Sequence, residues 1–441
     1  MQVLLRTFGC RANQYDSEQV RALCERAGIE VVESGDADIA VLNSCAVTRE
    51  AEADLRQAVR RIARERPGTR VVVTGCAAAR SALEIAALPG VTDVIAGADL
   101  AAVAAALHLR APMPTSESGA DQAPSAFTVL TRASRQSTAR ATLRVQDGCD
   151  EHCTFCATTL ARGAHRSRSA KEIVAEASLL AAHHAEIVLT GVHVGSWGRE
   201  HGRSIGALVT ALVRDVPTVR FRLASIEATE VDAELAEWLR DGGRRVCPYL
   251  HAPLQSGSDA VLKRMGRHWY TAREYARAID RLTAGRAVFG LGADIMAGFP
   301  GETDADQAET VALIRELPFT HLHVFPYSPR PGTAAERLGQ PVPPPVARAR
   351  AAELRAIGAD KSAAYAASRV GGRADLVVIG PAVGPVRGPA LRKALTEDYL
   401  EVRLIGDFPR GSRLHATIED GAMAVVTTAL TTTAPTLTAH H

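Results

Sequence analysis

Three of the chain's eight cysteines lie in one short stretch, "GCDEHCTFC" at residues 148–156. They are Cys149, Cys153 and Cys156, at the spacing C-x3-C-x2-C. Asp150, Glu151 and His152 mark a polar loop, which makes a chance cluster of buried thiols the weaker interpretation. Three thiolates this close can hold three corners of an iron–sulfur cube and leave the fourth iron open to a small molecule. Structural zinc, with His152 or His165 as fourth ligand, is the alternative that the spacing leaves open.

Three further cysteines share one position: each directly follows an apolar, strand-like run. They are Cys10 in "TFGCRANQ", Cys45 in "VLNSCAVT" and Cys76 in "VVTGCAAA". The carboxyl ends of parallel strands lie on one edge of a sheet, where ligand sites form. We therefore expect these thiols to converge on a second site. Cys24 and Cys247 have no such partners and are interpreted as small core residues.

The elements that must position the second set alternate between strand and helix over residues 1–110. A helix is predicted over 17–28, with Ser17 as its N-cap and Gly28 as its end. A charged amphipathic helix is predicted over 49–68. Strands are predicted at 2–8, 38–45 and 70–76. This alternation predicts a small α/β domain with a parallel sheet.

The rest of the chain divides by composition. Residues 111–137 are rich in Pro, Ser, Gly and Ala and are predicted to be a linker. Residues 138–367 hold about six strand–helix repeats, which predict a full or partial (β/α) barrel with its chemistry where strands end. Residues 368–430 hold short strands with Gly and Pro turns, typical of a small β-barrel or β-sandwich. Residues 431–441 are predicted to be a disordered tail.

Composition indicates an ordinary globular protein. Of 441 residues, 46% are apolar and 23% charged. The formal net charge is only +2, so any surface for nucleic acid must be local. The sequence shows no leader peptide and no run long enough to span a bilayer, so we expect a cytoplasmic protein with no membrane partner. In that compartment clustered cysteines are more often metal ligands or catalysts than disulfides.

The cysteine loop at the head of a β/α barrel resembles the signature of radical S-adenosylmethionine (SAM) enzymes. With the upstream cysteines and the C-terminal β domain, nearly the whole chain resembles the methylthiotransferases. The likeness also rests on "LTGVHVGSWG", "HAPLQSGSDAVLKRM", "DIMAGFPGET" and "HVFPYSPRPGT". Among the subfamilies the MtaB type is most similar, and the C-terminal domain resembles a TRAM domain, an RNA-binding β-barrel. Two places depart from the pattern: Ala157, Thr158 and Thr159 replace Ile-Ile-Pro, and Ala228 replaces a proline.

The resemblance implies a transferase with two 4Fe–4S clusters and SAM as cofactors. The three-cysteine loop would hold the cluster that binds SAM. An electron, from a donor such as flavodoxin or ferredoxin, would cleave SAM to a 5′-deoxyadenosyl radical, which takes hydrogen from carbon two of an adenine. The upstream cysteines would hold an auxiliary cluster that presents sulfur. A second SAM would methylate this sulfur before the methylthio group is transferred.

The implied substrate is N6-threonylcarbamoyladenosine, the base 3′ of the anticodon in the anticodon stem-loop of certain tRNAs. The product would be its 2-methylthio derivative. Alternatives are methylthiolation of N6-isopentenyladenosine in tRNA or of an aspartate in a ribosomal protein. A further alternative is a non-catalytic, metal-stabilised RNA-binding protein.

Two more sets of residues are expected near the clusters. Glycines and polar residues at strand ends let a ligand approach the backbone, and the expected SAM contacts are Gly191, Gln255, Ser256, Gly298 and Glu302. A basic strip, "ARGAHRSRSAK", follows the cysteine loop and suits phosphates. Its expected RNA contacts are Arg162, Arg166, Arg168 and Lys171.

Overall fold

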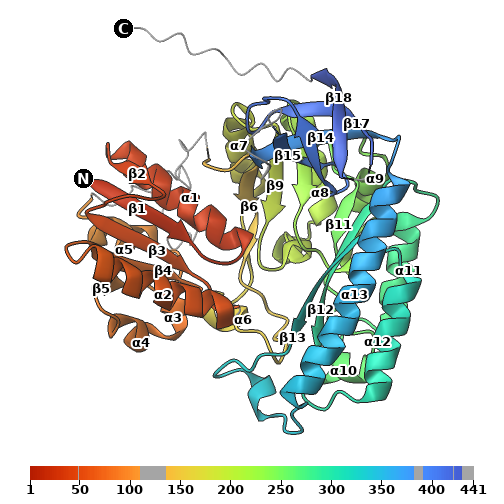
Figure 1. Cartoon of the computed structure of the whole chain (residues 1–441), viewed down its shortest axis with the longest axis horizontal. Helices are drawn as coiled ribbons and strands as arrows, with labels where there is room; N and C mark the ends of the chain where they lie inside the picture. Colours follow the sequence, from red (N-terminus) through yellow and green to blue (C-terminus); the bar gives the residue numbers. More distant parts are fainter. Residues whose placement is uncertain (48, 110–135, 382–390, 421, 430–441) are drawn as a thin grey trace.

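The structure is a computed structural model, which describes residues 1–47, 49–109, 136–381, 391–420 and 422–429. Most of the expected linker and all of the expected tail lie outside these ranges. The described part folds into three units, an N-terminal α/β domain, a central α/β unit and a C-terminal β-barrel (Figure 1). In the described ranges no helix is both long and apolar enough to cross a membrane.

The N-terminal domain is a parallel sheet in the order β2-β1-β3-β4-β5. Its strands are β1 (Gln2–Thr7), β2 (Glu30–Val32), β3 (Ile39–Ser44), β4 (Arg70–Gly75) and β5 (Val91–Val94). Its helices are α1 (Arg11–Arg26), α2 (Arg49–Glu65), α3 (Cys76–Arg80), α4 (Ala82–Ala86) and α5 (Leu100–Ala106). Val3 of β1 belongs to the core under α1 and α5, and Leu4 to the core under α2, α3 and α4. This alternation follows from the two-residue period of a strand.

Helix α1 begins at Arg11, so the predicted start at Ser17 is wrong. Cys10 is the N-cap, with an extended backbone. Ser17 lies inside the helix, where its Oγ accepts hydrogen bonds from Thr7 Oγ1 at 2.7 Å and from Asn43 Nδ2 at 3.0 Å. The first turns of this helix bury polar side chains, so no apolar period marks where the helix starts.

The central unit has six parallel strands in two sheets, β10-β9-β6 and β11-β12-β13. Isolated parallel bridges at Phe221–Val246 and Ser225–His251 join them into one curved wall. These strands are β6 (Ala141–Arg144), β9 (Glu186–Thr190), β10 (Arg220–Leu223), β11 (Tyr249–His251), β12 (Gly290–Ala297) and β13 (His321–Pro326). Among the described residues β13 does not pair with β6, so the expected barrel is a partial one.

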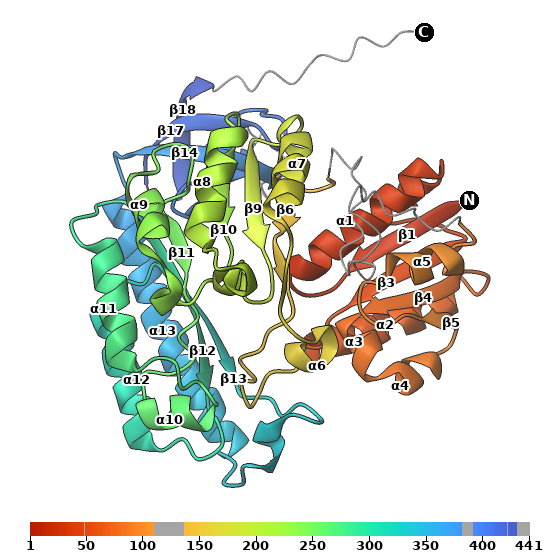
Figure 2. The same cartoon turned by 180° about the vertical axis from the view of Figure 1, so that it is seen from behind.

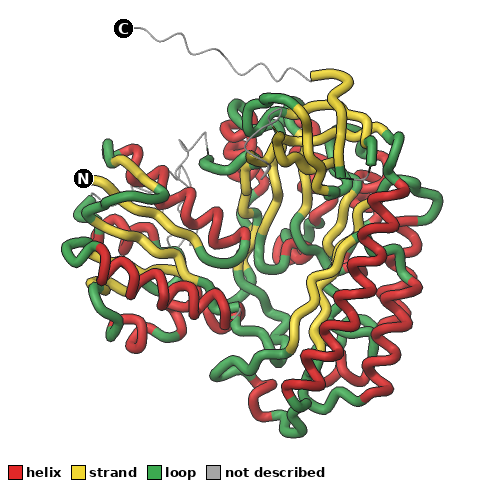
Figure 3. Tube along the Cα trace, viewed as in Figure 1, coloured by secondary structure: helices red, strands yellow, loops and turns green. Residues whose placement is uncertain are grey.

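Helices cover the outside of this wall (Figures 2 and 3). They are α7 (Ala170–Ala181), α8 (Ile205–Asp215), α9 (Ala233–Asp241), α10 (Asp259–Arg264), α11 (Ala272–Thr283), α12 (Asp304–Glu316) and α13 (Pro344–Ser368). The segment after β6 holds β7 (Gln146–Asp147), α6 (Thr158–Arg162) and β8 (Arg166–Ser167). Four single-turn helices, η1 (Val194–Ser196), η2 (Arg199–His201), η3 (Ala228–Glu230) and η4 (Ala334–Arg337), complete the unit.

The C-terminal unit is a closed barrel in the order β14-β15-β16-β18-β17, which confirms the expected small β-barrel. Its strands are β14 (Arg373–Pro381), β15 (Leu391–Thr396), β16 (Glu401–Ile405), β17 (Arg413–Ile418) and β18 (Met423–Ala429). It covers the starting ends of the central strands. Arg220 of β10 donates to the Asp375 carbonyl at 2.7 Å, and Arg222 donates to the Thr396 carbonyl at 2.8 Å.

Candidate metal and cofactor sites

The three-cysteine loop leaves β7 on the carboxyl side of β6. Gly148 begins it with φ +70°, and a Cβ there would lie 1.9 Å from the Ala164 carbonyl oxygen, so only glycine fits. Inside the loop, the Cys156 N–H donates to the Cys153 carbonyl at 3.0 Å. The Thr154 N–H donates to the carbonyl of Met265, just after α10, at 2.8 Å. These bonds hold the loop against the barrel.

Two cationic side chains face the sulfurs of this loop. His193 Nδ1 lies 3.6 Å from Cys149 Sγ, and Arg267 Nη1 donates to Cys153 Sγ at 3.6 Å. Burial raises the pKa of Cys153 to about 12, and the charge of Arg267 opposes that rise. Glu227 in turn holds Arg267 by an ion pair of 2.5 Å. The sulfurs of this loop therefore have donors aimed at them, an arrangement that would tune a bound cluster.

Two buried side-chain oxygens that lack a hydrogen-bond partner within the described part of the chain lie just after β10 and β11, on the carboxyl side of the central strands. Gln255, which follows β11, has φ +68° and is buried. Among the described residues, neither its Oε1 nor Oε2 of buried Glu227 has a hydrogen-bond partner. Such an orphaned acceptor costs about 1–3 kcal/mol unless a ligand donor meets it. Both atoms suit a ligand that brings ammonium or hydroxyl donors, as SAM does. Ser256 Oγ already pairs with Thr310 Oγ1 at 3.2 Å.

The other expected SAM contacts are engaged within the protein. Gly191 follows β9, and a Cβ there would lie 2.8 Å from the Gln146 carbonyl oxygen. Gly298 follows β12 with φ +76°, and a Cβ there would lie 2.3 Å from a side-chain carbon of α13. Glu302 accepts from the Gly298 N–H at 3.0 Å and pairs with Arg350 at 2.7 Å. Close packing explains all three residues, and their contact with SAM stays a prediction.

The second cysteine set lies together at the carboxyl edge of the N-terminal sheet. Gly9, with φ +92°, passes so close to Cys45 that a Cβ on it would lie 2.4 Å from Cys45 Sγ. Asn13 stands between the other two thiols, with its Oδ1 4.0 Å from Cys10 Sγ and 3.8 Å from Cys76 Sγ. Cys45 and Cys76 are buried, whereas Cys10 is exposed. The chain thus brings the three thiols to one place.

Arg162 of α6 joins the two cysteine sites. Its Nη2 donates to Asn13 Oδ1 at 2.7 Å and pairs with Asp16 at 2.8 Å, while its Nη1 pairs with Asp147 at 3.1 Å. Burial raises the pKa of the Cys76 thiol to about 11, and the guanidinium of Arg162 opposes that rise. A side chain that begins six residues after Cys156 therefore lies within the second site.

Two of the four expected RNA contacts do not lie on the surface, which corrects that expectation. The side chain of Arg162 is only 5% exposed and that of Arg168 is 0% exposed. Arg168 pairs with Glu176 of α7 at 2.8 Å and donates to the hydroxyl of Tyr15 in α1 at 3.3 Å. Both arginines fasten the N-terminal domain to the central unit. Arg166 and Lys171 are exposed.

Sequence reasoning missed Asn13, His193, Glu227 and Arg267. Asn13 and His193 stand inside motifs that were quoted, "GCRANQ" and "TGVHVG". Their polar type near a cysteine or a strand end was the available signal. Spacing along the chain does not show which thiol a distant side chain reaches, so the pairing of Arg267 with Cys153 became visible only in the fold.

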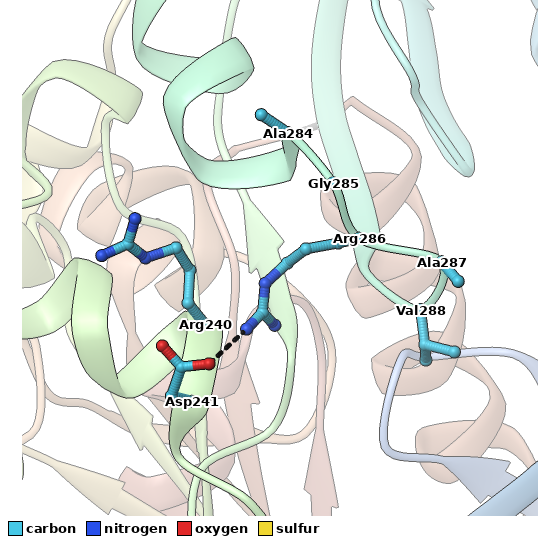
Figure 4. Close-up of a pocket in the computed structure, with 7 residues that line it drawn as sticks. All are labelled: Arg240, Asp241, Ala284, Gly285, Arg286, Ala287 and Val288. Atoms are coloured by element: carbon cyan, nitrogen blue, oxygen red, sulfur yellow. Dashed lines mark hydrogen bonds and ion pairs between the residues drawn. The ribbon is translucent and has the colours of Figure 1, made fainter.

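A depression of about 550 Å³ lies elsewhere, lined by Arg240, Asp241 and residues 284–288 (Figure 4). It stands between the end of α9 and the start of β12, whereas the cysteine loop lies at the carboxyl ends of the strands. Its only carboxylate, Asp241, pairs with Arg286 at 3.2 Å. This hollow takes no part in the cysteine sites.

Comparison with known proteins agrees with this arrangement. Residues 2–97 match the uncharacterized protein family UPF0004, and residues 143–314 match the radical SAM superfamily. The chain resembles a solved radical SAM methyltransferase, TsrM from Kitasatospora setae, with a TM-score of 0.55 and 16% identity over 76% of this chain and 73% of that one. That likeness concerns the fold alone.

Two curated relatives show which kind of radical SAM protein the chain resembles. The chain is 35% identical to the threonylcarbamoyladenosine tRNA methylthiotransferase MtaB of Thermotoga maritima, over 82% of this chain and 83% of the relative. It is 33% identical to the tRNA-2-methylthio-N(6)-dimethylallyladenosine synthase of Erythrobacter litoralis, over 85% of each. The chain belongs to the MtaB-type radical SAM methylthiotransferase family. Its expected class, a transferase that uses SAM and 4Fe–4S clusters, is confirmed at this level.

Proposed function

We propose that this chain is a tRNA methylthiotransferase that acts on carbon two of N6-threonylcarbamoyladenosine beside the anticodon. The observation that carries the proposal is the presence of two three-cysteine sites on two domains, joined by Arg162 and Asn13. A reaction that both activates a carbon and supplies sulfur needs two such sites side by side. The choice of base is supported by the relative from Thermotoga maritima, whose name specifies threonylcarbamoyladenosine.

The residues fit the clusters that the family implies. Each set offers three thiols, the usual ligands of a 4Fe–4S cube, and leaves one iron for another ligand. In the first set Arg267 and His193 already face the sulfurs. When bound, the first cluster supplies the electron that cleaves SAM and starts radical chemistry, and the second presents the sulfur that is transferred. The electron comes from a small donor such as flavodoxin or ferredoxin.

The protein's own contribution is to hold the two cysteine sites in fixed positions relative to each other. Arg168, Glu176 and Tyr15 form a buried polar contact between α1 and α7. Arg162 adds a second contact at the edge where the thiols lie. Rigid placement of reacting groups supplies much of an enzyme's advantage, because reactive partners held about 3–3.5 Å apart avoid the entropy cost of meeting.

The tRNA needs a basic surface, and two exposed places offer one. Arg166 and Lys171 lie just beyond the cysteine loop. On the C-terminal barrel, exposed Arg403 of β16 is the cross-strand neighbour of Lys393 of β15, which is half-buried and pairs with Glu401 at 2.9 Å. We propose that both places contact phosphates, the first near the modified base and the second farther along the tRNA.

Nucleoside analysis tests the proposed substrate. The reconstituted protein is incubated without oxygen with SAM, a reductant and tRNA that carries either threonylcarbamoyladenosine or isopentenyladenosine, and digested nucleosides are weighed by mass spectrometry. Methylthiolation of the first tRNA alone supports the proposal. The relative from Erythrobacter litoralis makes the isopentenyl base the second candidate substrate. If only that base were modified, it would replace threonylcarbamoyladenosine as the proposed substrate. Modification of neither tRNA would favour the ribosomal-protein or non-catalytic alternative.

A further inference from the structure

The inner wall of the barrel carries a group of potential metal ligands that contains no cysteine. Asp294 of β12 is the register partner of His323 in β13. His251 ends β11 and is the partner of Gly292, two residues before Asp294 on the same face of β12. Alternate residues of a strand share a face, so the three side chains project together from neighbouring strands.

The ligand atoms of this group converge. Asp294 Oδ2 lies 3.2 Å from His251 Nε2, and Asp294 Oδ1 lies 3.6 Å from His323 Nδ1. All three ligand atoms lie within 4.8 Å of one another. One carboxylate therefore stands between two imidazole nitrogens, each aimed at it from a separate strand.

Gly292 makes room for this arrangement. A Cβ on Gly292 would lie 2.8 Å from His251 Nδ1 and 2.1 Å from His321 Nε2. His321 itself is engaged elsewhere, because its two ring nitrogens lie 3.3 Å from Tyr249 Oη and 3.3 Å from Thr320 Oγ1. The space above the glycine is thus filled by the ring of His251, which pairs with Asp294, and by the ring of His321, which packs beside it.

The group is walled on one side and open on the other. The side chain of His251 is 10% exposed, that of Asp294 28% and that of His323 62%. The open side gives a metal ion a path to the three ligand atoms.

We propose that His251, Asp294 and His323 bind a divalent transition-metal ion of the zinc class inside the barrel. Two imidazoles and one carboxylate are a ligand set used by zinc and by iron(II), with open positions for other ligands. Calcium and magnesium prefer all-oxygen sites and do not suit this set. This ligand set shares no residue with either cysteine set, and the proposal does not depend on which base the enzyme modifies.

Metal analysis of the holoprotein tests this site. Protein with both clusters assembled is dialysed without oxygen against a series of zinc concentrations, and zinc and iron are measured together. We expect one zinc per chain in addition to the cluster iron. His323→Ala should weaken zinc binding by at least about tenfold with no change in iron. Because the His323 side chain is mostly exposed, this variant should fold normally. His183→Ala, at an exposed position after α7, is the matched control and should bind zinc as the parent does.

X-ray absorption at the zinc edge identifies the ligands. Nitrogen and oxygen neighbours alone, lost in Asp294→Asn, support the site. Sulfur neighbours would mean that zinc has entered a cysteine site and would overturn the proposal. Two other results would also overturn the proposal: zinc binding by His323→Ala that equals that of the parent, or no zinc uptake by protein with full iron content. The three side chains would then be interpreted as a hydrogen-bonded group without a metal. Neither result bears on tRNA modification.

Discussion

Arg162 of the central unit and Asn13 of the N-terminal domain are joined by a hydrogen bond of 2.7 Å between Nη2 and Oδ1. Arg162 follows the first cysteine set in the chain, and Asn13 stands between two thiols of the second. One contact thus links the two sites. It also explains why a basic residue in an apparently exposed strip is buried: its charge is matched by Asp16 and Asp147.

Replacing Arg162 by Ala should damage the second site and the domain contact together. The change takes one of two cations from each of two buried carboxylates, because Asp16 and Asp147 keep Arg144 at 2.5 Å and 3.4 Å. We therefore expect a loss of about 1–3 kcal/mol in the free energy of unfolding. Urea unfolding measures this loss, and iron content of the anaerobic protein should fall toward that of one cluster. Arg166→Ala, at an exposed neighbour, should change stability by less than about 0.5 kcal/mol. Equal stability of the two variants would contradict the linking role.

Replacing Cys153 by Ala should abolish the reductive cleavage of SAM while the second cluster remains. Two thiols do not hold a cube that must also bind SAM. The measurements are 5′-deoxyadenosine production and iron content, with Cys24→Ala, a buried cysteine away from both sets, as control. Normal 5′-deoxyadenosine production by the Cys153 variant would refute the assignment of the loop.

Replacing Cys45 by Ala should separate the two halves of the reaction. The second cluster is lost, yet SAM cleavage persists because the barrel loop is untouched. The tRNA should then carry no methylthio group when its nucleosides are analysed by mass spectrometry. If the Cys45 variant still modified tRNA, the second set of cysteines would have to be interpreted as core residues and not as cluster ligands.

The buried carboxylate of Glu186 should make the barrel sensitive to acid. It accepts hydrogen bonds from Arg220 at 2.9 Å and from Arg222 at 2.7 Å, and although burial favours its neutral form, these arginines hold its pKa well below the usual 4.5. A depressed pKa means that the stabilisation is present above the unfolded-state value and is lost as pH falls below it. Glu186→Gln should cost about 3–5 kcal/mol at neutral pH. Urea unfolding repeated at lower pH measures the effect. The difference in the free energy of unfolding between variant and parent should shrink as the pH falls, and a difference that stays constant would argue against this pairing.

Reversing one charge on the C-terminal barrel tests its role in RNA binding. Arg403→Glu should weaken tRNA binding and reduce the slope of log affinity against log salt by about 1, as expected for a lost phosphate contact. Arg403 is exposed on β16, so iron content should not change. Glu419→Lys, at an exposed position after β17, changes charge on the same barrel and serves as control. An unchanged slope in Arg403→Glu would move the RNA contact toward Arg166 and Lys171.

The C-terminal barrel packs more closely against the central unit than an independent β domain would. Its Asp375 and Thr396 carbonyls accept from Arg220 and Arg222, both fully buried in the central unit. Tyr399 stacks on Tyr249 at 4.5 Å between ring centroids. Point substitutions on its surface are therefore cleaner tests than deletion, which would leave buried arginines without partners.

The sequence by itself determined the two cysteine sets and the layers that carry them. A cysteine after an apolar strand must lie at the carboxyl edge of a parallel sheet, so Cys10, Cys45 and Cys76 were placed correctly by local pattern alone. Only the tertiary structure decided what surrounds them. Arg162 and Arg168 have the same residue type and nearly the same sequence context as exposed Arg166, yet both find partners in helix α1, far along the chain. Asp16 pairs with Arg162, and the Tyr15 hydroxyl accepts from Arg168. The same holds for His251, Asp294 and His323, because strand pairing between distant residues, which no local spacing encodes, brings their side chains together.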